Sequence, residues 1–98
     1  MDIGDVENLS NFVKRPGMYI PRTDSANIIS FIHGYESGAQ GKCKFSDALS
    51  KLLTEKYLIK KYATGWSNQI ERYSEKECVS WVEAFSQTAS EVLSQVSS

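Results

Sequence analysis

The sequence contains few of the residues from which catalytic and metal sites are usually built. It has one histidine, His33, and two cysteines, Cys43 and Cys78, whose spacing does not match a zinc-binding pattern. It also lacks a glycine-rich phosphate-binding loop. Nucleophilic catalysis needs a nucleophile, a base and a third group that orients the base. We therefore predict that the protein is not an enzyme and holds no metal or cofactor, with a catalytic role for His33 as an alternative.

Long apolar runs and a secretory leader are also lacking. No apolar stretch approaches the ~18 residues of a membrane span. The first residues contain neither the basic segment nor the apolar segment of a secretory signal. These features predict a cytoplasmic protein that does not contact a membrane. Cys43 and Cys78 are expected as thiols in such a compartment, although the sequence leaves a disulfide between them open.

The chain carries almost no net charge. Its formal net charge of −1 at pH 7 excludes a generally basic nucleic-acid-binding protein. The charges are nevertheless segregated: residues 1–38 have three basic and five acidic groups, residues 39–65 have six and two, and residues 66–98 have two and five. Such segregation is typical of solvated helix faces, and it is also compatible with a charged recognition surface.

Apolar residues at helical spacing dominate the C-terminal part of the chain. They form one stripe with a period of about 3.6 residues. The stripe consists of Cys78, Trp81, Val82, Phe85, Ala89, Val92 and Val96. Ser74 and Glu77 match the Ser-x-x-Glu capping box that opens many helices. The pattern predicts a long helix from Ser74 to about Val96.

Four shorter helices are predicted upstream by the same periodicity. They cover residues 5–14, about 24–35, 46–63 and 66–73. Asp24 or Thr23 would cap the second of them and Ser46 the third. Residues 16–21 are expected to form an extended strut whose apolar side chains pack under the helices. The sequence thus predicts an all-α fold of about five helices with a long C-terminal helix, forming one domain over residues 1–98.

Four short motifs follow one another along the chain: Arg15-Pro16-Gly17-Met18-Tyr19-Ile20, then Phe31-Ile32-His33-Gly34-Tyr35, then Gly65-Trp66, and finally Phe85 in a terminal helix. This ordered set resembles a group of small bacterial immunity proteins, which accompany toxins of contact-dependent growth inhibition and related polymorphic toxin systems. The order and spacing of the motifs cover nearly the whole chain. Pro21 departs from the pattern, which usually has glycine after Tyr-Ile.

The resemblance implies an antidote that binds the C-terminal domain of one cognate toxin and covers its active site. Such toxins are often nucleases, with an RNase favoured here, and the complex would contain one monomer of each protein. Since a nuclease groove is basic, carboxylates and aromatic anchors are the expected contacts. The candidate contact residues are Asp24, Tyr35, Glu36, Glu71, Tyr73 and Glu75.

The motif residues themselves are expected to form helix junctions and core. The alternative function is a small nucleic-acid-binding or regulatory domain that uses the basic segment 42–61. Binding of that kind would weaken steeply with salt and on substitution of its lysines.

Overall fold

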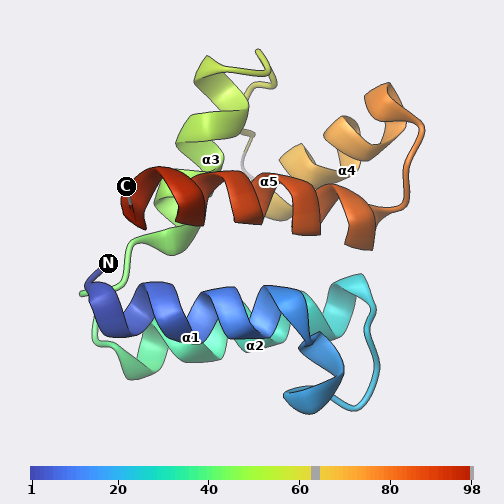
Figure 1. Ribbon diagram of the computed structural model, residues 1–98. Coiled ribbons are helices and arrows are strands. Elements are labelled where there is room, and N and C mark those ends of the chain that lie inside the picture. The colour runs from blue at the N-terminus through green and yellow to red at the C-terminus, as the bar shows by residue number, and fades with distance from the viewer. Residues whose placement is uncertain (63–64, 98) are drawn as a thin grey trace.

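The computed structural model describes residues 1–62 and 65–97 and shows a helical protein (Figure 1). Five α-helices and one short 3₁₀-helix follow one another, and the described residues contain no strand. The elements are α1 (Ile3–Lys14), η1 (Pro16–Met18), α2 (Ser25–Gly38), α3 (Phe45–Glu55), α4 (Trp66–Glu77) and α5 (Trp81–Ser97). The predicted all-α fold with about five helices is therefore confirmed.

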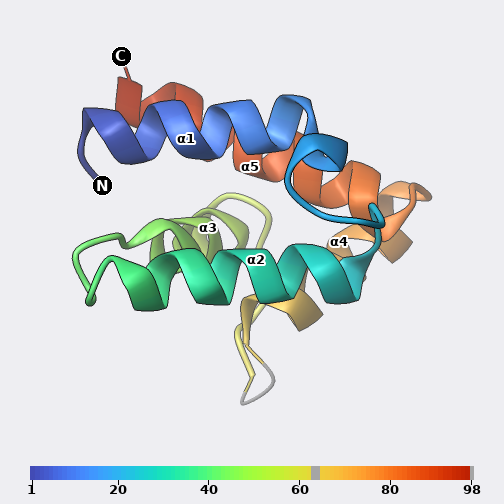
Figure 2. The ribbon, with the colours of Figure 1, turned by 90° about the horizontal axis from the view of Figure 1, so that it is seen from below.

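The C-terminal helix α5 organises the packing of the other helices. It contacts α1 on one side and both α3 and α4 on the other (Figure 1). Seen from below, α2 runs alongside α1 and also lies next to α3 (Figure 2). Because α5 is amphipathic over its whole length, one apolar face can serve several neighbours at once.

Phe85 on α5 lies at the meeting point of these helices. Its ring is 6.5 Å from the ring of Phe12 on α1, 6.4 Å from Phe45 on α3 and 6.0 Å from Trp66 on α4. Edge-on and tilted arrangements at these distances are favourable for aromatic pairs. The aromatic cluster is surrounded by buried aliphatic side chains: Leu9, Ile28, Ile32, Leu49, Leu53, Ile70, Ala84, Ala89 and Val92. The core thus joins every helix to α5 or its neighbours.

Helices α1 and α2 are held together by aromatic stacking and by polar contacts that are partly exposed to solvent. Phe12 stacks on Phe31 with ring centroids 3.9 Å apart. The Tyr35 hydroxyl donates to the Asp5 carboxylate at 2.7 Å and accepts from the Asn8 amide at 3.2 Å. The burial of the Tyr35 hydroxyl raises its pKa. These contacts fix α2 beside α1.

The extended conformation predicted for residues 16–21 is wrong. Pro16 starts a 3₁₀ turn, and the amides of Met18 and Tyr19 donate to the carbonyls of Arg15 and Pro16. Met18 is 74 % exposed, so its expected place in the core is also wrong. Tyr19 remains partly exposed while its ring packs edge-on against Phe12. Proline fixes φ near the helical value, which explains a turn where extended backbone was expected.

The predicted helix from Ser74 to Val96 is two helices. Cys78 adopts a left-handed conformation (φ 57°), and the amide of Val79 donates back to the Ser74 carbonyl at 3.0 Å. This pattern is the Schellman motif that ends α4. Cys78 is exposed rather than part of the apolar stripe. The Ser80 hydroxyl, not Ser74, accepts from the Glu83 amide at the start of α5 (3.1 Å).

The predicted third helix is also shorter than expected. It ends at Glu55 instead of residue 63, which lies outside the described residues, and Leu58 has a left-handed backbone (φ 57°). Ser46 is not its cap. Its amide and its hydroxyl both donate to the carboxylate of Glu36 on α2, at 2.9 and 2.8 Å. A carboxylate from another helix therefore satisfies the first turn of α3. None of the helices in residues 1–62 and 65–97 combines the length and the hydropathy that a membrane-spanning helix needs.

Candidate functional site: an acidic groove between α2, α4 and α5

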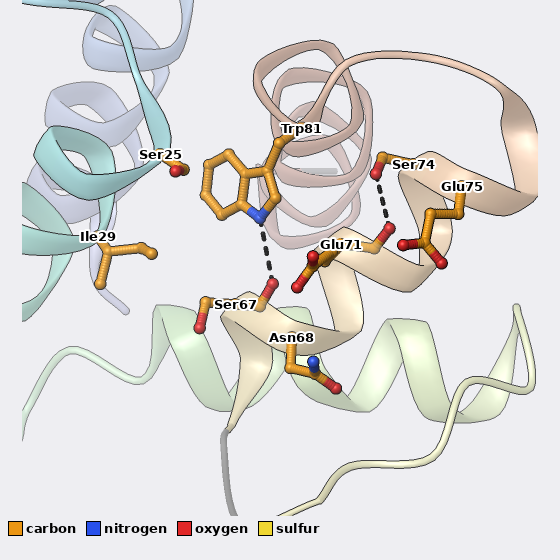
Figure 3. A pocket seen from close by; sticks show the side chains of 8 residues that line it. All are labelled: Ser25, Ile29, Ser67, Asn68, Glu71, Ser74, Glu75 and Trp81. Carbon is orange, nitrogen blue, oxygen red and sulfur yellow. Dashed lines mark hydrogen bonds between the residues drawn. The ribbon is translucent and has the colours of Figure 1, made fainter.

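A groove of about 560 Å³ lies where the start of α2 and the start of α5 meet the outer face of α4. Figure 3 shows the side chains that line it. They are Ser25 and Ile29 from α2, Ser67, Asn68, Glu71, Ser74 and Glu75 from α4, and Trp81 from α5. The lining is polar except for one aliphatic and one aromatic side chain. The groove therefore combines an apolar surface with carboxylates.

Trp81 provides the aromatic surface of the groove. Its indole N–H donates to the Ser67 carbonyl at 3.1 Å, which fixes the ring against α4 (Figure 3). The ring also stacks on Phe85, with centroids 5.7 Å apart and planes inclined by 3°. The apolar stripe predicts Trp81 to be a core residue. Its side chain is half-buried, so it contributes to the core and also lines the groove. The indole is thus held rigidly while part of it faces solvent.

Glu71 and Glu75 provide the charge of the groove. They are one helical turn apart on α4, and both are exposed. Like charges at this spacing destabilise a helix by about 0.2–0.5 kcal/mol. Among the described residues the one ion pair joins Lys56 to Glu91, so neither groove carboxylate has a cationic partner within the part of the chain described. A cation supplied from outside would relieve this repulsion.

Asp24 precedes the groove residue Ser25 and caps α2. Its carboxylate accepts from the Asn27 amide and from the Asn27 side chain, both at 2.9 Å. These hydrogen bonds lower the pKa of Asp24. The predicted cap of the second helix is thereby confirmed. Asp24 is thus the neighbour in sequence of a groove residue and does not itself line the groove.

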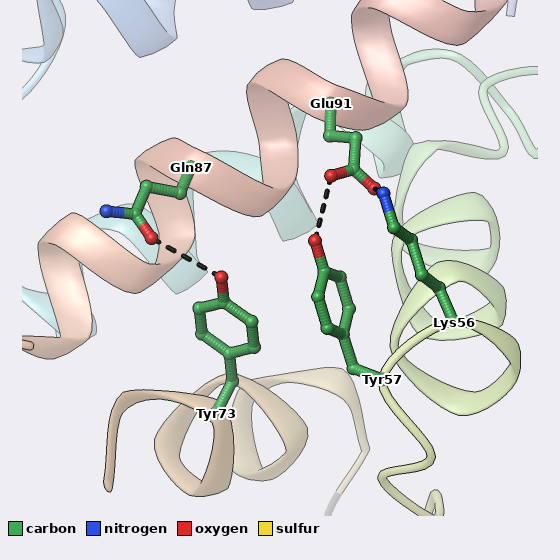
Figure 4. Close-up of polar contacts among 5 residues, drawn as sticks. All are labelled: Lys56, Tyr57, Tyr73, Gln87 and Glu91. Atoms are coloured by element: carbon green, nitrogen blue, oxygen red, sulfur yellow. Dashed lines mark hydrogen bonds and ion pairs between the residues drawn. The ribbon is translucent and has the colours of Figure 1, made fainter. Parts of the chain in front are cut away.

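The other predicted contact residues serve contacts within the chain. Tyr35 binds α1, and Glu36 holds the start of α3 through Ser46. Tyr73 is 6 % exposed, which corrects its assignment as a surface anchor. Its ring packs edge-on against Tyr57 at 4.9 Å, and its hydroxyl donates to the Gln87 amide oxygen at 3.4 Å (Figure 4).

His33 lies on the exposed side of α2. Its imidazole packs edge-on to Trp66 at 6.3 Å. No hydrogen bond joins His33 to a carboxylate or a hydroxyl among the described residues. The same part of the chain contains no cluster of histidine, cysteine and carboxylate side chains that could hold a metal ion.

The basic segment forms a surface separate from the acidic groove. Six lysines are exposed along it: Lys42, Lys44, Lys51, Lys56, Lys60 and Lys61. Two of them precede α3, Lys51 lies on it, and the other three follow it. Lys56 is paired with Glu91 at 2.9 Å (Figure 4). None of these six lysines lines the groove, whose charged side chains are the carboxylates of Glu71 and Glu75.

Sequence reasoning missed that Trp81 would line the candidate site. The available signal was its position near the start of the apolar stripe, three residues after Cys78 and two residues before the charged Glu83. Tryptophan is large and is therefore rarely buried completely.

Comparison of the chain with protein-family models, curated proteins and solved structures gives no match.

Proposed function

We propose that this protein is an immunity protein that binds the C-terminal domain of a cognate toxin and neutralises it without catalysis. The acidic groove with its fixed indole is the observation that carries this proposal, and the ordered motifs of the sequence support it. The toxin domain would be a nuclease, with an RNase favoured. The complex would contain one copy of each chain.

Electrostatics support a basic partner for the groove. Nuclease substrate sites carry lysine and arginine side chains that contact phosphates. Glu71 and Glu75 present two carboxylates at the spacing of one helical turn, and Asp24 precedes the groove residue Ser25 in the chain. Opposite charges on the two partners steer their encounter and speed association, most strongly at low salt.

The indole supports a tight rather than a loose contact. Binding energy in protein interfaces concentrates on rigid aromatic residues near the centre of the contact. Trp81 has little freedom to lose on binding, because it is already fixed by Ser67 and Phe85. A guanidinium or ammonium group over its face would also gain a cation–π interaction. The active site of the toxin domain would be covered by this surface.

The test measures affinity and neutralisation together. The C-terminal domain of the toxin encoded next to this chain is titrated with the protein by calorimetry, and its toxicity is scored on co-expression. We expect nanomolar affinity, roughly −12 kcal/mol, and full protection. Absence of both binding and protection would refute the proposed function.

Charge reversal in the groove locates the contact. Glu71→Lys is expected to weaken binding at least tenfold, about 1.4 kcal/mol, mainly through slower association. Glu77→Lys makes the same change of charge on the same helix, at an exposed position that does not line the groove. It should bind within about twofold of the wild-type protein. Equal effects of the two variants would place the contact elsewhere.

A further inference from the structure

The chain between α3 and α4 contains an exposed leucine in a conformation that leucine rarely adopts. Leu58 has φ 57° and is 82 % exposed. The left-handed turn has a structural role, because it lets the Ile59 amide donate to the Leu53 carbonyl at 3.0 Å behind the end of α3. Glycine is the usual residue for such a turn. The leucine side chain gains no burial in this fold that would offset the strain.

The segment that carries Leu58, residues 57–62, is fixed from inside the protein. The Tyr57 hydroxyl donates to Glu91 at 2.8 Å (Figure 4), and Gln69 donates to the Ile59 carbonyl at 2.8 Å. The Arg72 guanidinium donates to the Lys60 carbonyl and lies 4.5 Å from the ring of Tyr62. Each of these contacts comes from α4 or α5. Leu58 is therefore presented on a held segment.

The charges on this segment have one sign. Lys60 and Lys61 are exposed beside Leu58, and residues 56–62 contain no carboxylate. Lys56 is neutralised by Glu91, but among the described residues no ion pair involves Lys60 or Lys61. An apolar side chain flanked by cations complements an apolar pocket with acidic groups around it.

We propose that residues 57–62 form a second docking surface, on which Leu58 enters an apolar pocket rimmed by carboxylates on the toxin domain. This inference rests on the proposed function and adds a contact that is chemically opposite to the groove. Glu71 of the groove and Arg72, which holds the segment, are consecutive on α4. One partner can therefore contact both surfaces. A partner whose own surface carries charge of a single sign complements either the groove or residues 57–62, but not both.

Leu58→Gly distinguishes a role in binding from a role in folding, because we expect it to weaken binding without lowering the stability of the fold. Glycine adopts the left-handed conformation without strain, so the variant should melt at or above the wild-type temperature. Its affinity for the toxin domain should fall at least tenfold in calorimetry. Leu58→Asn, which also tolerates this conformation, should lose affinity in the same way. It keeps the test valid if the glycine variant is less stable than expected.

Gln40→Gly is the matched control. Gln40 is the exposed left-handed residue after α2 (φ 53°), and it lies outside the segment. Its replacement should relieve the same strain and leave affinity unchanged. Binding of both Leu58 variants within twofold of a binding wild-type protein would overturn this inference and leave the proposed function intact. If the wild-type protein does not bind the toxin domain, both the proposed function and the second docking surface are refuted.

The lysines distinguish a protein partner from a nucleic acid. Lys60→Glu and Lys61→Glu should slow association with the toxin domain and reduce its salt dependence, whereas Lys51→Glu on α3 should not. A short single-stranded RNA is titrated in parallel. If the RNA binds with a steep salt dependence that Lys60→Glu removes, while toxin binding is unchanged, the surface is a nucleic-acid site and the inference is wrong.

Discussion

Gln69 is the buried polar residue on which three parts of the chain converge. It is fully buried on α4, accepts from the Ser50 hydroxyl at 2.6 Å and donates to the Thr54 hydroxyl at 3.0 Å and to the Ile59 carbonyl at 2.8 Å. A buried amide whose hydrogen-bonding groups are satisfied stabilises one arrangement of its neighbours. The residue therefore sets the distance between α3, α4 and the segment that follows α3.

Gln69→Ala is expected to destabilise the protein by about 2–4 kcal/mol. The substitution leaves the Ile59 carbonyl and the Ser50 hydroxyl without partners and opens a cavity. Chemical denaturation followed by circular dichroism measures this loss. Gln87→Ala, which removes an exposed glutamine and the long hydrogen bond that it accepts from Tyr73, should lower the free energy of unfolding by no more than about 1 kcal/mol. Equal stability of the two variants would contradict the role assigned to Gln69.

At the scale of single residues, sequence reasoning identified side chains with local roles. Asp24 was predicted as a cap because its carboxylate needs the amide three residues further on and nothing else. Tyr73 was assigned to the surface, although its ring packs against Tyr57, a residue 16 positions earlier. Local hydrogen bonds follow from spacing, whereas long-range packing depends on how the helices meet.

The break between α4 and α5 shows, at the scale of elements, that a local sequence pattern does not predict structure that depends on long-range packing. The apolar period continues through Cys78 almost without a shift, so periodicity predicts one helix. The chain turns there without glycine or proline, the two residues that usually announce a turn. The compensating contacts are tertiary: Trp81 reaches back to Ser67 and covers α4. The turn places α5 across α4 and thereby creates the groove.

Cys78→Gly is expected to stabilise the protein by about 0.5–1 kcal/mol. Glycine removes the strain of the left-handed position at the end of α4 and exposes no new polar group. Ser80→Ala should act in the opposite direction, by about 1 kcal/mol, because it removes the hydroxyl that accepts from Glu83. Thermal melts of both variants test the pair. A lower melting temperature for Cys78→Gly would show that the turn depends on the thiol.

At the scale of the whole molecule, helix α5 connects the acidic groove to the basic segment. Trp81 at its start lines the groove, and Glu91 near its end binds Lys56 and Tyr57 (Figure 4). The all-α fold could be predicted because helical periods are local. The groove could not, because its lining comes from three helices whose crossing depends on the core around Phe85. Glu71 and Glu75 were identified through their charge, and Trp81 only through the structure.

The Glu91 cluster makes stability depend on pH. Partial burial alone would raise the pKa of Glu91, but the hydrogen bonds from Lys56 and Tyr57 outweigh it and lower the pKa. A lowered pKa in the folded state means that its stabilisation is present above about pH 4 and is lost as the pH falls further. When the pH is lowered from 6 to 3, the free energy of unfolding of Glu91→Gln should therefore fall by about 0.5 kcal/mol less than that of the wild-type protein.

Unfolding by urea at the two pH values measures this difference. Glu55→Gln removes an exposed carboxylate at the end of α3 and should keep the wild-type pH response. A Glu91→Gln protein with the same acid sensitivity as wild type would show that the cluster does not contribute to the pH dependence.

Helix α5 also decides where the protein can be tethered. Its last turn brings Val96 beside Met1 and beside Ile3 and Val6 of α1, so the N-terminus and the last turn of α5 lie at one edge (Figure 1). Its first residue, Trp81, lies in the groove at the opposite end, about 25 Å away for 17 residues of helix. A bead, a dye or a fused domain attached at the N-terminus therefore leaves the acidic groove open.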